Sequence, residues 1–162
     1  MTKDINLNEN DNIQETYQEM KKRQQEELKK IPRKYAFSDE QFKQGMKDLG
    51  LNENDTDKIV GIGAGGFMKK TDVEAYKELQ KKHFKEFWTE IAKDTVGDKF
   101  IKNMFLYELN NHEYSYTNDI TDTLMSLGLS DKDIRENENL RTGLLLAEKE
   151  ILEAEEREEE EI

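Results

Sequence analysis

At 162 residues, with 34% hydrophobic and 38% charged residues, the chain can bury only a modest core, so we expect one small domain with extensions. No apolar run approaches the roughly 20 residues needed to span a bilayer, and the polar N-terminus lacks the pattern of a secretory signal, so a cytoplasmic protein without membrane contact is expected. The lack of cysteine excludes disulfides and thiolate chemistry, and the net charge of -12 disfavours nucleic-acid binding by the whole surface.

The first 33 residues divide into a polar end and a basic helix. Residues 1–10 have little to bury and are expected to be disordered. Residues 11–33 are predicted to form an amphipathic helix, which Pro32 ends. One stripe of this helix recurs at spacings of three and four and consists of Ile13, Tyr17, Met20, Gln24 and Leu28. The other face is basic, because seven cations and only two glutamates lie between residues 21 and 34.

Residues 34–130 contain most of the aromatic side chains and are predicted to form the core domain. Short strands are predicted over 34–37 and 58–62, and Ser38 with Gln41 three residues later predicts a helix start. The helices predicted here span about 38–49, 71–93, 98–109 and 119–128. We therefore expect a mainly α protein (α+β), a compact helical core with a short two-stranded hairpin, flanked by charged N- and C-terminal helices.

A glycine run matches the G-x-G-x-x-G pattern of dinucleotide-binding loops through Gly61, Gly63 and Gly66. In such proteins the glycines lie between a buried strand and the N-terminus of a helix that faces the pyrophosphate. Here the preceding strand is short, and residues 67–70 separate the glycines from the next helix. We interpret the run as a tight turn, with ligand contact at Gly61 to Gly66 as the alternative.

A polar corner follows the aromatic-rich helix that ends near residue 109. Its candidate functional residues are Asn111, His112, Glu113, Tyr114 and Asp119. His112 and Glu113 could serve as an acid–base pair or as metal ligands, but no H-x-x-x-H or H-E-x-x-H spacing supports a metal site. We favour a corner that satisfies helix ends. The other histidine, His83, lies on the edge of an apolar helix face and is interpreted as a hydrogen-bonded structural residue.

Residues 131–162 are predicted to form an acidic amphipathic helix. From residue 137 onward there are ten glutamates and three cations. The apolar seam recurs in steps of four and three, at Leu140, Leu144, Ala147, Ile151 and Ala154. Because the N-terminal helix has a similar seam and opposite charge, we predict that the two pair, within one chain or in a homodimer. Candidate partner-binding residues on the two helices are Glu148, Glu150, Glu153, Glu155, Glu156, Lys21, Lys22 and Arg23.

Four segments occur in order along the core: YAFSDEQF at 35–42, GAGGF at 63–67, YELNNHEY at 107–114, and DTL with LGL at 122–129. This signature resembles an uncharacterised family of small proteins carried by phages, prophages and plasmids of low-GC Gram-positive and gut bacteria. The resemblance covers residues 34 to 130, and it implies membership of a family without an assigned activity.

The resemblance, the acidity and the lack of a catalytic motif favour a non-catalytic protein of a mobile element that needs no cofactor. We expect it to bind a host protein, such as a basic nucleic-acid-handling protein or a defence nuclease, as an anti-CRISPR-like or other anti-defence inhibitor. One alternative is an accessory replication or regulatory protein that uses the basic helix on nucleic acid. Another is a metal- or nucleotide-dependent enzyme.

Overall fold

The computed structural model describes residues 14–161. These residues form eight α-helices and a small three-stranded antiparallel sheet, which confirms a mainly α protein with some β structure. The segment expected to be disordered, residues 1–10, lies outside the described residues, as do the first residues of the predicted basic helix. Within the described part, no helix is both long enough and apolar enough to cross a bilayer.

The chain divides into two compact units, and each is described by itself. One unit, here called the β unit, consists of residues 22–89. The other, here called the helical unit, combines the chain up to Lys21 with the chain from Glu90 onward. The boundaries between the units fall inside two helices, α1 (Tyr17–Lys29) and α3 (Val73–Lys93). The division therefore differs from the predicted segments, which change at residues 34 and 131.

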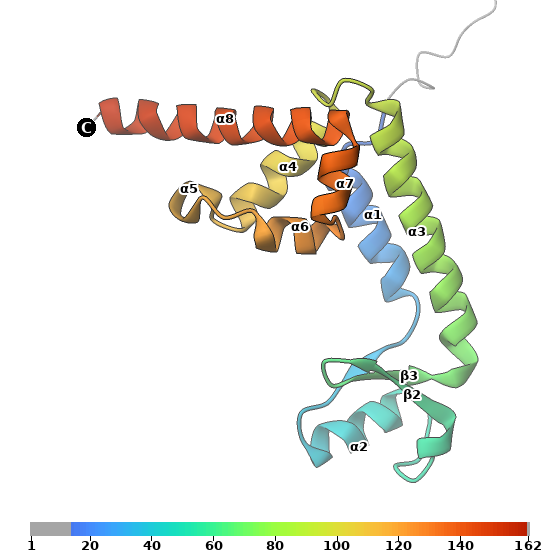
Figure 1. Ribbon diagram of the computed structural model, residues 1–162. Coiled ribbons are helices and arrows are strands. Elements are labelled where there is room, and N and C mark those ends of the chain that lie inside the picture. Colours follow the sequence, from blue (N-terminus) through green and yellow to red (C-terminus); the bar gives the residue numbers. More distant parts are fainter. Residues whose placement is uncertain (1–13, 162) are drawn as a thin grey trace, which may run out of the picture. The chain divides into compact units, whose positions relative to one another are not determined.

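The sheet of the β unit is built around a strand that the sequence did not reveal (Figure 1). Its strands are β1 (Lys34–Tyr35), β2 (Ile59–Gly63) and β3 (Gly66–Lys69), in the order β1-β3-β2. We expected the two predicted strands to pair with each other, but both pair with β3. β3 is the strand with the buried side chains, because Phe67 and Met68 are 5% and 0% exposed, and in the central position both of its edges pair with neighbouring strands.

The glycine run forms the turn between β2 and β3. Gly63, Ala64 and Gly65 have φ of 89°, 51° and 78°, a left-handed stretch that glycine adopts without strain. A Cβ at Gly65 would lie 2.9 Å from the backbone oxygen of Ala36. The glycines therefore serve an antiparallel hairpin, whereas a dinucleotide site requires them between a strand and a helix.

Helix α2 (Asp39–Asp48) packs on this sheet and begins and ends where the sequence predicted. The side chain of Ser38 accepts a hydrogen bond from the backbone N–H of Gln41, which satisfies a free donor of the first turn. At the other end Gly50 has φ of 75°, and the next N–H returns to the carbonyl of Met46. Met46, Leu49 and Phe67 form the buried centre of this cluster.

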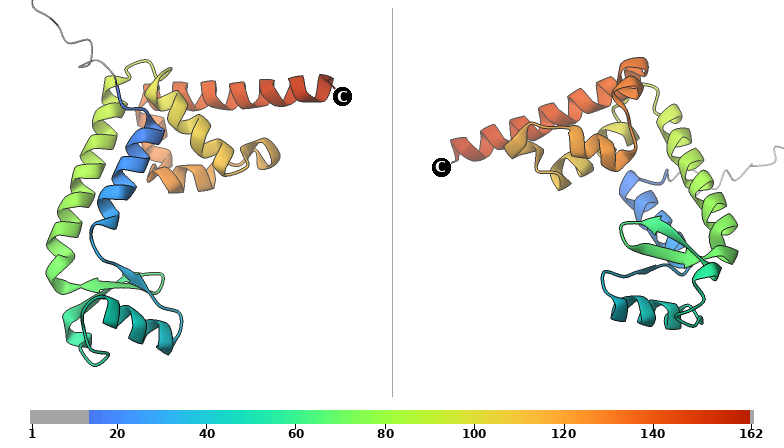
Figure 2. Two further views of the ribbon diagram at one scale, coloured as in Figure 1. Left: turned by 180° about the vertical axis from the view of Figure 1, so that it is seen from behind. Right: turned by 60° about the horizontal axis from the view of Figure 1, so that its bottom comes forward.

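The helical unit is organised around α4 (Phe100–Asn111). The other helices that belong wholly to this unit are α5 (Tyr114–Thr117), α6 (Thr121–Leu127), α7 (Asp131–Glu136) and α8 (Glu138–Glu160). The predicted helix over 131–162 is interrupted at Asn137, whose backbone is extended with φ of -119° and ψ of 104°. The short α7 before it starts at a capping box formed by Ser130 and Asp133. Figures 1 and 2 show α8 lying along α4 and continuing past α4 and α5 toward the C-terminus.

Both terminal seams pack on α4. Tyr17 of α1 makes edge-on ring contacts with Phe100 and Tyr107, and α8 buries Leu144 and Ala147 where it lies along α4. The charged residues of α1 that belong to the helical unit use an acidic partner on α4, which is described next. Pairing of the two terminal helices, within one chain or in a homodimer, stays a prediction.

Candidate functional site

The centre of the helical unit is a buried carboxylate, Glu108 on α4, which is 1% exposed. Its Oε1 accepts hydrogen bonds from the Tyr17 hydroxyl at 2.6 Å and from Lys21 Nζ at 2.7 Å. Its Oε2 accepts a hydrogen bond from the Ser126 hydroxyl at 3.2 Å, and His112 Nε2 lies 3.6 Å away. The carboxylate therefore connects α1, α4 and α6 through donors that occupy both of its oxygens.

The protonation states of this network follow from burial and hydrogen bonding. Burial raises the pKa of Glu108, but hydrogen bonds from Lys21 and Tyr17 outweigh it and hold the pKa below the usual value for glutamate. Burial, followed by the hydrogen bond to Glu108, raises the pKa of Tyr17 above that of a free tyrosine. At neutral pH the carboxylate is thus ionised and the phenol protonated, which is the arrangement of strong charge-assisted hydrogen bonds.

Sequence reasoning missed Glu108 as a functional residue, although a signal was present. Glu108 lies seven and four residues after Ile101 and Met104, which places it on the apolar face of the same helix. A charged residue in a core-facing register requires a buried partner. Tyr17, the one aromatic residue outside the predicted core, is that partner.

This network makes the stability of the protein dependent on pH. The pKa of Glu108 is lower in the folded than in the unfolded state, so its contribution to stability is complete above the unfolded pKa and is lost as pH falls through the folded pKa. We expect the unfolding free energy of the wild type to decrease more steeply below about pH 4.5 than that of Glu108→Gln. Urea titrations of both proteins between pH 3 and 7 test this. Parallel pH profiles would contradict it.

The predicted polar corner mostly satisfies helix ends. Glu113 has φ of 56°, and its carbonyl accepts hydrogen bonds from the N–H groups of Tyr116 and Thr117 in α5. The Asp119 carboxylate accepts the N–H of Thr121 at 2.8 Å at the start of α6. Asn111 lines a groove of about 320 Å³ between α1 and α4. Within residues 14–161, His112, Glu113 and Asp119 do not converge as three metal-ligand atoms.

One corner residue links the corner to the acidic helix. Tyr114 is 5% exposed, and its hydroxyl donates a hydrogen bond to Glu148 Oε2 of α8 at 2.8 Å. Burial, followed by the hydrogen bond to Glu148, raises the pKa of Tyr114 to about 12. This hydrogen bond holds α5 against α8. Tyr116, on the same short helix, is 85% exposed.

Beside Tyr116 lies an acidic groove of about 440 Å³, formed by α4, α5 and α8. Its lining residues are Leu106 and Asn110 from α4, Ser115 and Tyr116 from α5, and Glu150, Ile151, Ala154, Glu155 and Glu158 from α8. Carboxylates and apolar side chains thus share one surface with an exposed aromatic ring. Of the predicted partner-binding glutamates, Glu150 and Glu155 line the groove, whereas Glu153 and Glu156 are exposed on α8 and do not line it.

The predicted basic residues are largely engaged within the protein. Lys21 pairs with Glu108, Arg23 contacts Glu27 and Glu86, and Lys22 is exposed. A nucleic-acid role for this helix requires cations that can reach phosphates. The internal ion pairs remove much of the charge on which that alternative depends.

Comparison with known proteins places the chain in a family. Residues 16–150 match the family of unknown function DUF7659. The chain belongs to this family. This confirms the resemblance to a family without an assigned function, and the match extends beyond residues 34–130 to include Tyr17, Lys21 and most of α8. No curated protein and no solved structure matches the chain.

Proposed function

We propose that the protein acts by binding another protein, and that the acidic groove accepts a cationic segment of that partner. The observation that carries this proposal is the combination found in the groove: three glutamates, an apolar floor and a tyrosine ring that is 85% exposed. A tyrosine so exposed contributes little to its own fold. It is therefore available for contact with a partner.

The chemistry of the groove suits arginine and lysine side chains. Their aliphatic stems can pack on Leu106 and Ile151, while the charged groups pair with Glu155 and Glu158. A guanidinium above the Tyr116 ring adds a cation–π interaction. The net charge of -12 attracts a basic partner during diffusional encounter, and this long-range contribution weakens as salt is added.

Surfaces rich in arginine and lysine occur on proteins that handle nucleic acids. The partner class we propose is a host nuclease or related protein, which the glutamates of α8 would engage at a surface that otherwise holds phosphates. An anti-defence inhibitor remains the role we propose, and its support is the resemblance of the core signature to proteins of phages and plasmids.

A matched pair of variants tests the groove against general acidity. The groove variant combines Tyr116→Ala, Glu155→Gln and Glu158→Gln. The control combines Leu145→Ala, Glu156→Gln and Glu160→Gln, exposed positions of α8 that do not line the groove. Both variants change the net charge equally and remove one exposed large side chain. Tagged wild type and variants are used to capture proteins from bacterial lysate at low and high salt, and bound proteins are quantified by mass spectrometry.

We expect a basic protein to be captured by the wild type and the control variant at low salt, to be lost at high salt, and to be reduced at least tenfold with the groove variant. Direct titration of the captured protein with each variant then measures the affinities. Equal capture by all three proteins, or equal loss from both variants, would overturn the groove as the binding site.

A further inference from the structure

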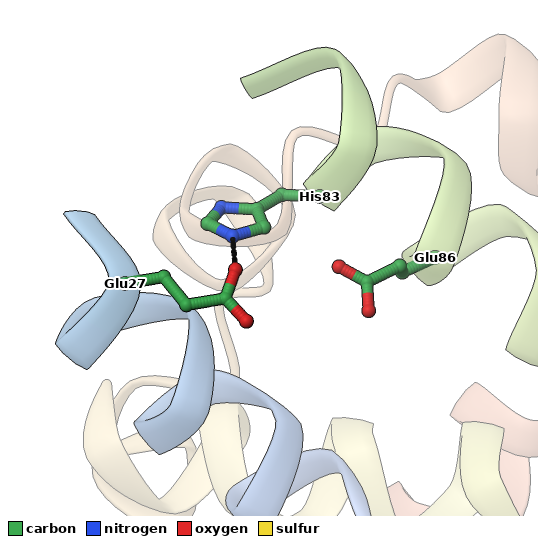
Figure 3. Close-up of side chains that lie close together, drawn as sticks. All are labelled: Glu27, His83 and Glu86. Carbon is green, nitrogen blue, oxygen red and sulfur yellow. Dashed lines mark hydrogen bonds and ion pairs between the residues drawn. The ribbon is translucent and has the colours of Figure 1, made fainter. Parts of the chain in front are cut away.

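A second cluster of chemically active side chains lies in the β unit, apart from the acidic groove. Glu27 comes from α1, and His83 and Glu86 lie three residues apart on one face of α3. One ligand atom from each residue lies within 4.8 Å of the other two. Figure 3 shows the imidazole and both carboxylates facing the same space between the two helices.

The geometry is close to that of a metal centre. His83 Nε2 lies 2.9 Å from Glu27 Oε2. Two ligand atoms at about 2.0–2.2 Å from a tetrahedral zinc ion are about 3.4 Å apart, so this pair needs to separate by only about half an ångström. Histidine and glutamate at a spacing of three on one helix project to the same side, and Glu27 supplies the third ligand from the facing helix.

We propose that Glu27, His83 and Glu86 bind a divalent transition-metal ion with the preferences of zinc. One imidazole and two carboxylates are ligands that zinc accepts, and three protein ligands leave a fourth position for water or for a side chain from a partner. The ion would fasten the part of α1 that follows Lys21 to α3. His83 is 9% exposed, so one side of the ion would be shielded from solvent.

Two cations compete with the ion for these carboxylates. Arg23 Nη1 lies 2.9 Å from Glu27, and its Nη2 lies 2.5 Å from Glu86. Lys82 Nζ is 3.3 Å from Glu27. The Arg23 guanidinium therefore bridges the two carboxylates that the metal would use. Binding requires this bridge to open, which lowers the affinity and gives the site a distinctive response to mutation.

One ligand, Glu27, is ionised near neutral pH, whereas His83 Nε2 has to give up the hydrogen that it shares with Glu27 before it can bind the ion. The hydrogen bond with His83, followed by that from Arg23, lowers the pKa of Glu27 to about 2, so its carboxylate is ionised. The geometry of the three side chains remains the basis of the proposal.

Zinc titration of the full chain by calorimetry tests the site, with cobalt absorption as a second readout. We expect one ion per chain. His83→Ala and Glu86→Gln should each weaken binding at least about tenfold, in line with the effects of disrupting metal sites. Arg23→Gln should strengthen binding by a factor of about two to five, because a competing ion pair of ordinary strength is removed. Circular dichroism confirms that each variant is folded.

His112→Ala is the matched control, because His112 is the only other histidine and also lies near a glutamate. It should leave zinc binding unchanged, and the ring signals of His83 alone should shift in ¹⁵N spectra when zinc is added. No binding by the wild type and by Arg23→Gln would overturn the proposal. So would binding that persists in both His83→Ala and Glu86→Gln, which would assign the ions to the glutamates of α8.

Discussion

Replacing Glu108 with alanine is expected to lower the unfolding free energy by about 3 kcal/mol, the low end of the cost of removing one member of a buried ion pair. The substitution leaves the Tyr17 and Ser126 hydroxyls without their acceptor in a buried environment. Lys21 is 30% exposed and can turn to water, which limits the loss. Urea denaturation followed by circular dichroism measures the change.

Two further variants locate the effect in this network. Tyr17→Phe keeps the ring packing and removes one hydrogen bond, so it should cost about 1–2 kcal/mol. Glu156→Ala changes an exposed glutamate of α8 and should stay within about 0.5 kcal/mol of the wild type. If Glu108→Ala and Glu156→Ala have the same unfolding free energy, the buried carboxylate does not stabilise the helical unit as described.

Alanine at Gly143 or Gly97 is expected to be the other strongly destabilising change. At Gly143 a Cβ would overlap Cγ2 of Ile101 and lie 2.7 Å from the carbonyl oxygen of Gly97, so α8 would have to shift away from α4 and from the Gly97 turn. Overpacking of this kind costs about 1–3 kcal/mol or more, which exceeds the gain of about 1 kcal/mol from alanine in a helix. Gly97 has φ of 100°, and its Cβ would overlap the backbone oxygen of Asn139.

Gly128→Ala separates backbone strain from crowding. Gly128 also has a positive φ, 67°, but a Cβ there meets nothing within 4 Å. We expect this substitution to cost about 1–2 kcal/mol, from the left-handed conformation alone. Gly97→Ala should cost more than Gly128→Ala in thermal or urea unfolding. Equal costs would show that the contact between the Gly97 turn and α8 adjusts without penalty.

Local signals predicted the elements of the fold well. Ser38 and Gly50 mark the ends of α2 because capping and left-handed termination depend on nearby residues. The apolar periodicity predicted α3, α4 and α6 near their observed bounds. Strand β3 was missed because four residues after a glycine turn carry too little pattern. Its identity as a strand depends on pairing with both neighbours.

The sites depend on contacts between distant parts of the chain, and a single sequence does not specify these. Tyr17 and Glu108 are 91 positions apart, and Glu27 and His83 are 56 apart. The corner around His112 was a candidate site because its polar residues are adjacent in sequence, yet most of them satisfy helix ends. The predicted glutamates of α8 divide into those that line the acidic groove and those on its other faces. That division requires the position of α8 on α4 and α5.

The last turns of α8 have a thermodynamic consequence. Ile151 is the last buried residue within the described chain, so residues 152–160 remain helical mainly through their own propensity. Glutamates repel one another at spacings of four, as at 155 and 159 or 156 and 160, and they oppose the dipole at a helix C-terminus. A cationic partner would relieve this repulsion, so binding and helix ordering reinforce each other. In the proposed complex, part of the attraction would stabilise the helix end, so residues that never touch the partner could change the strength of association.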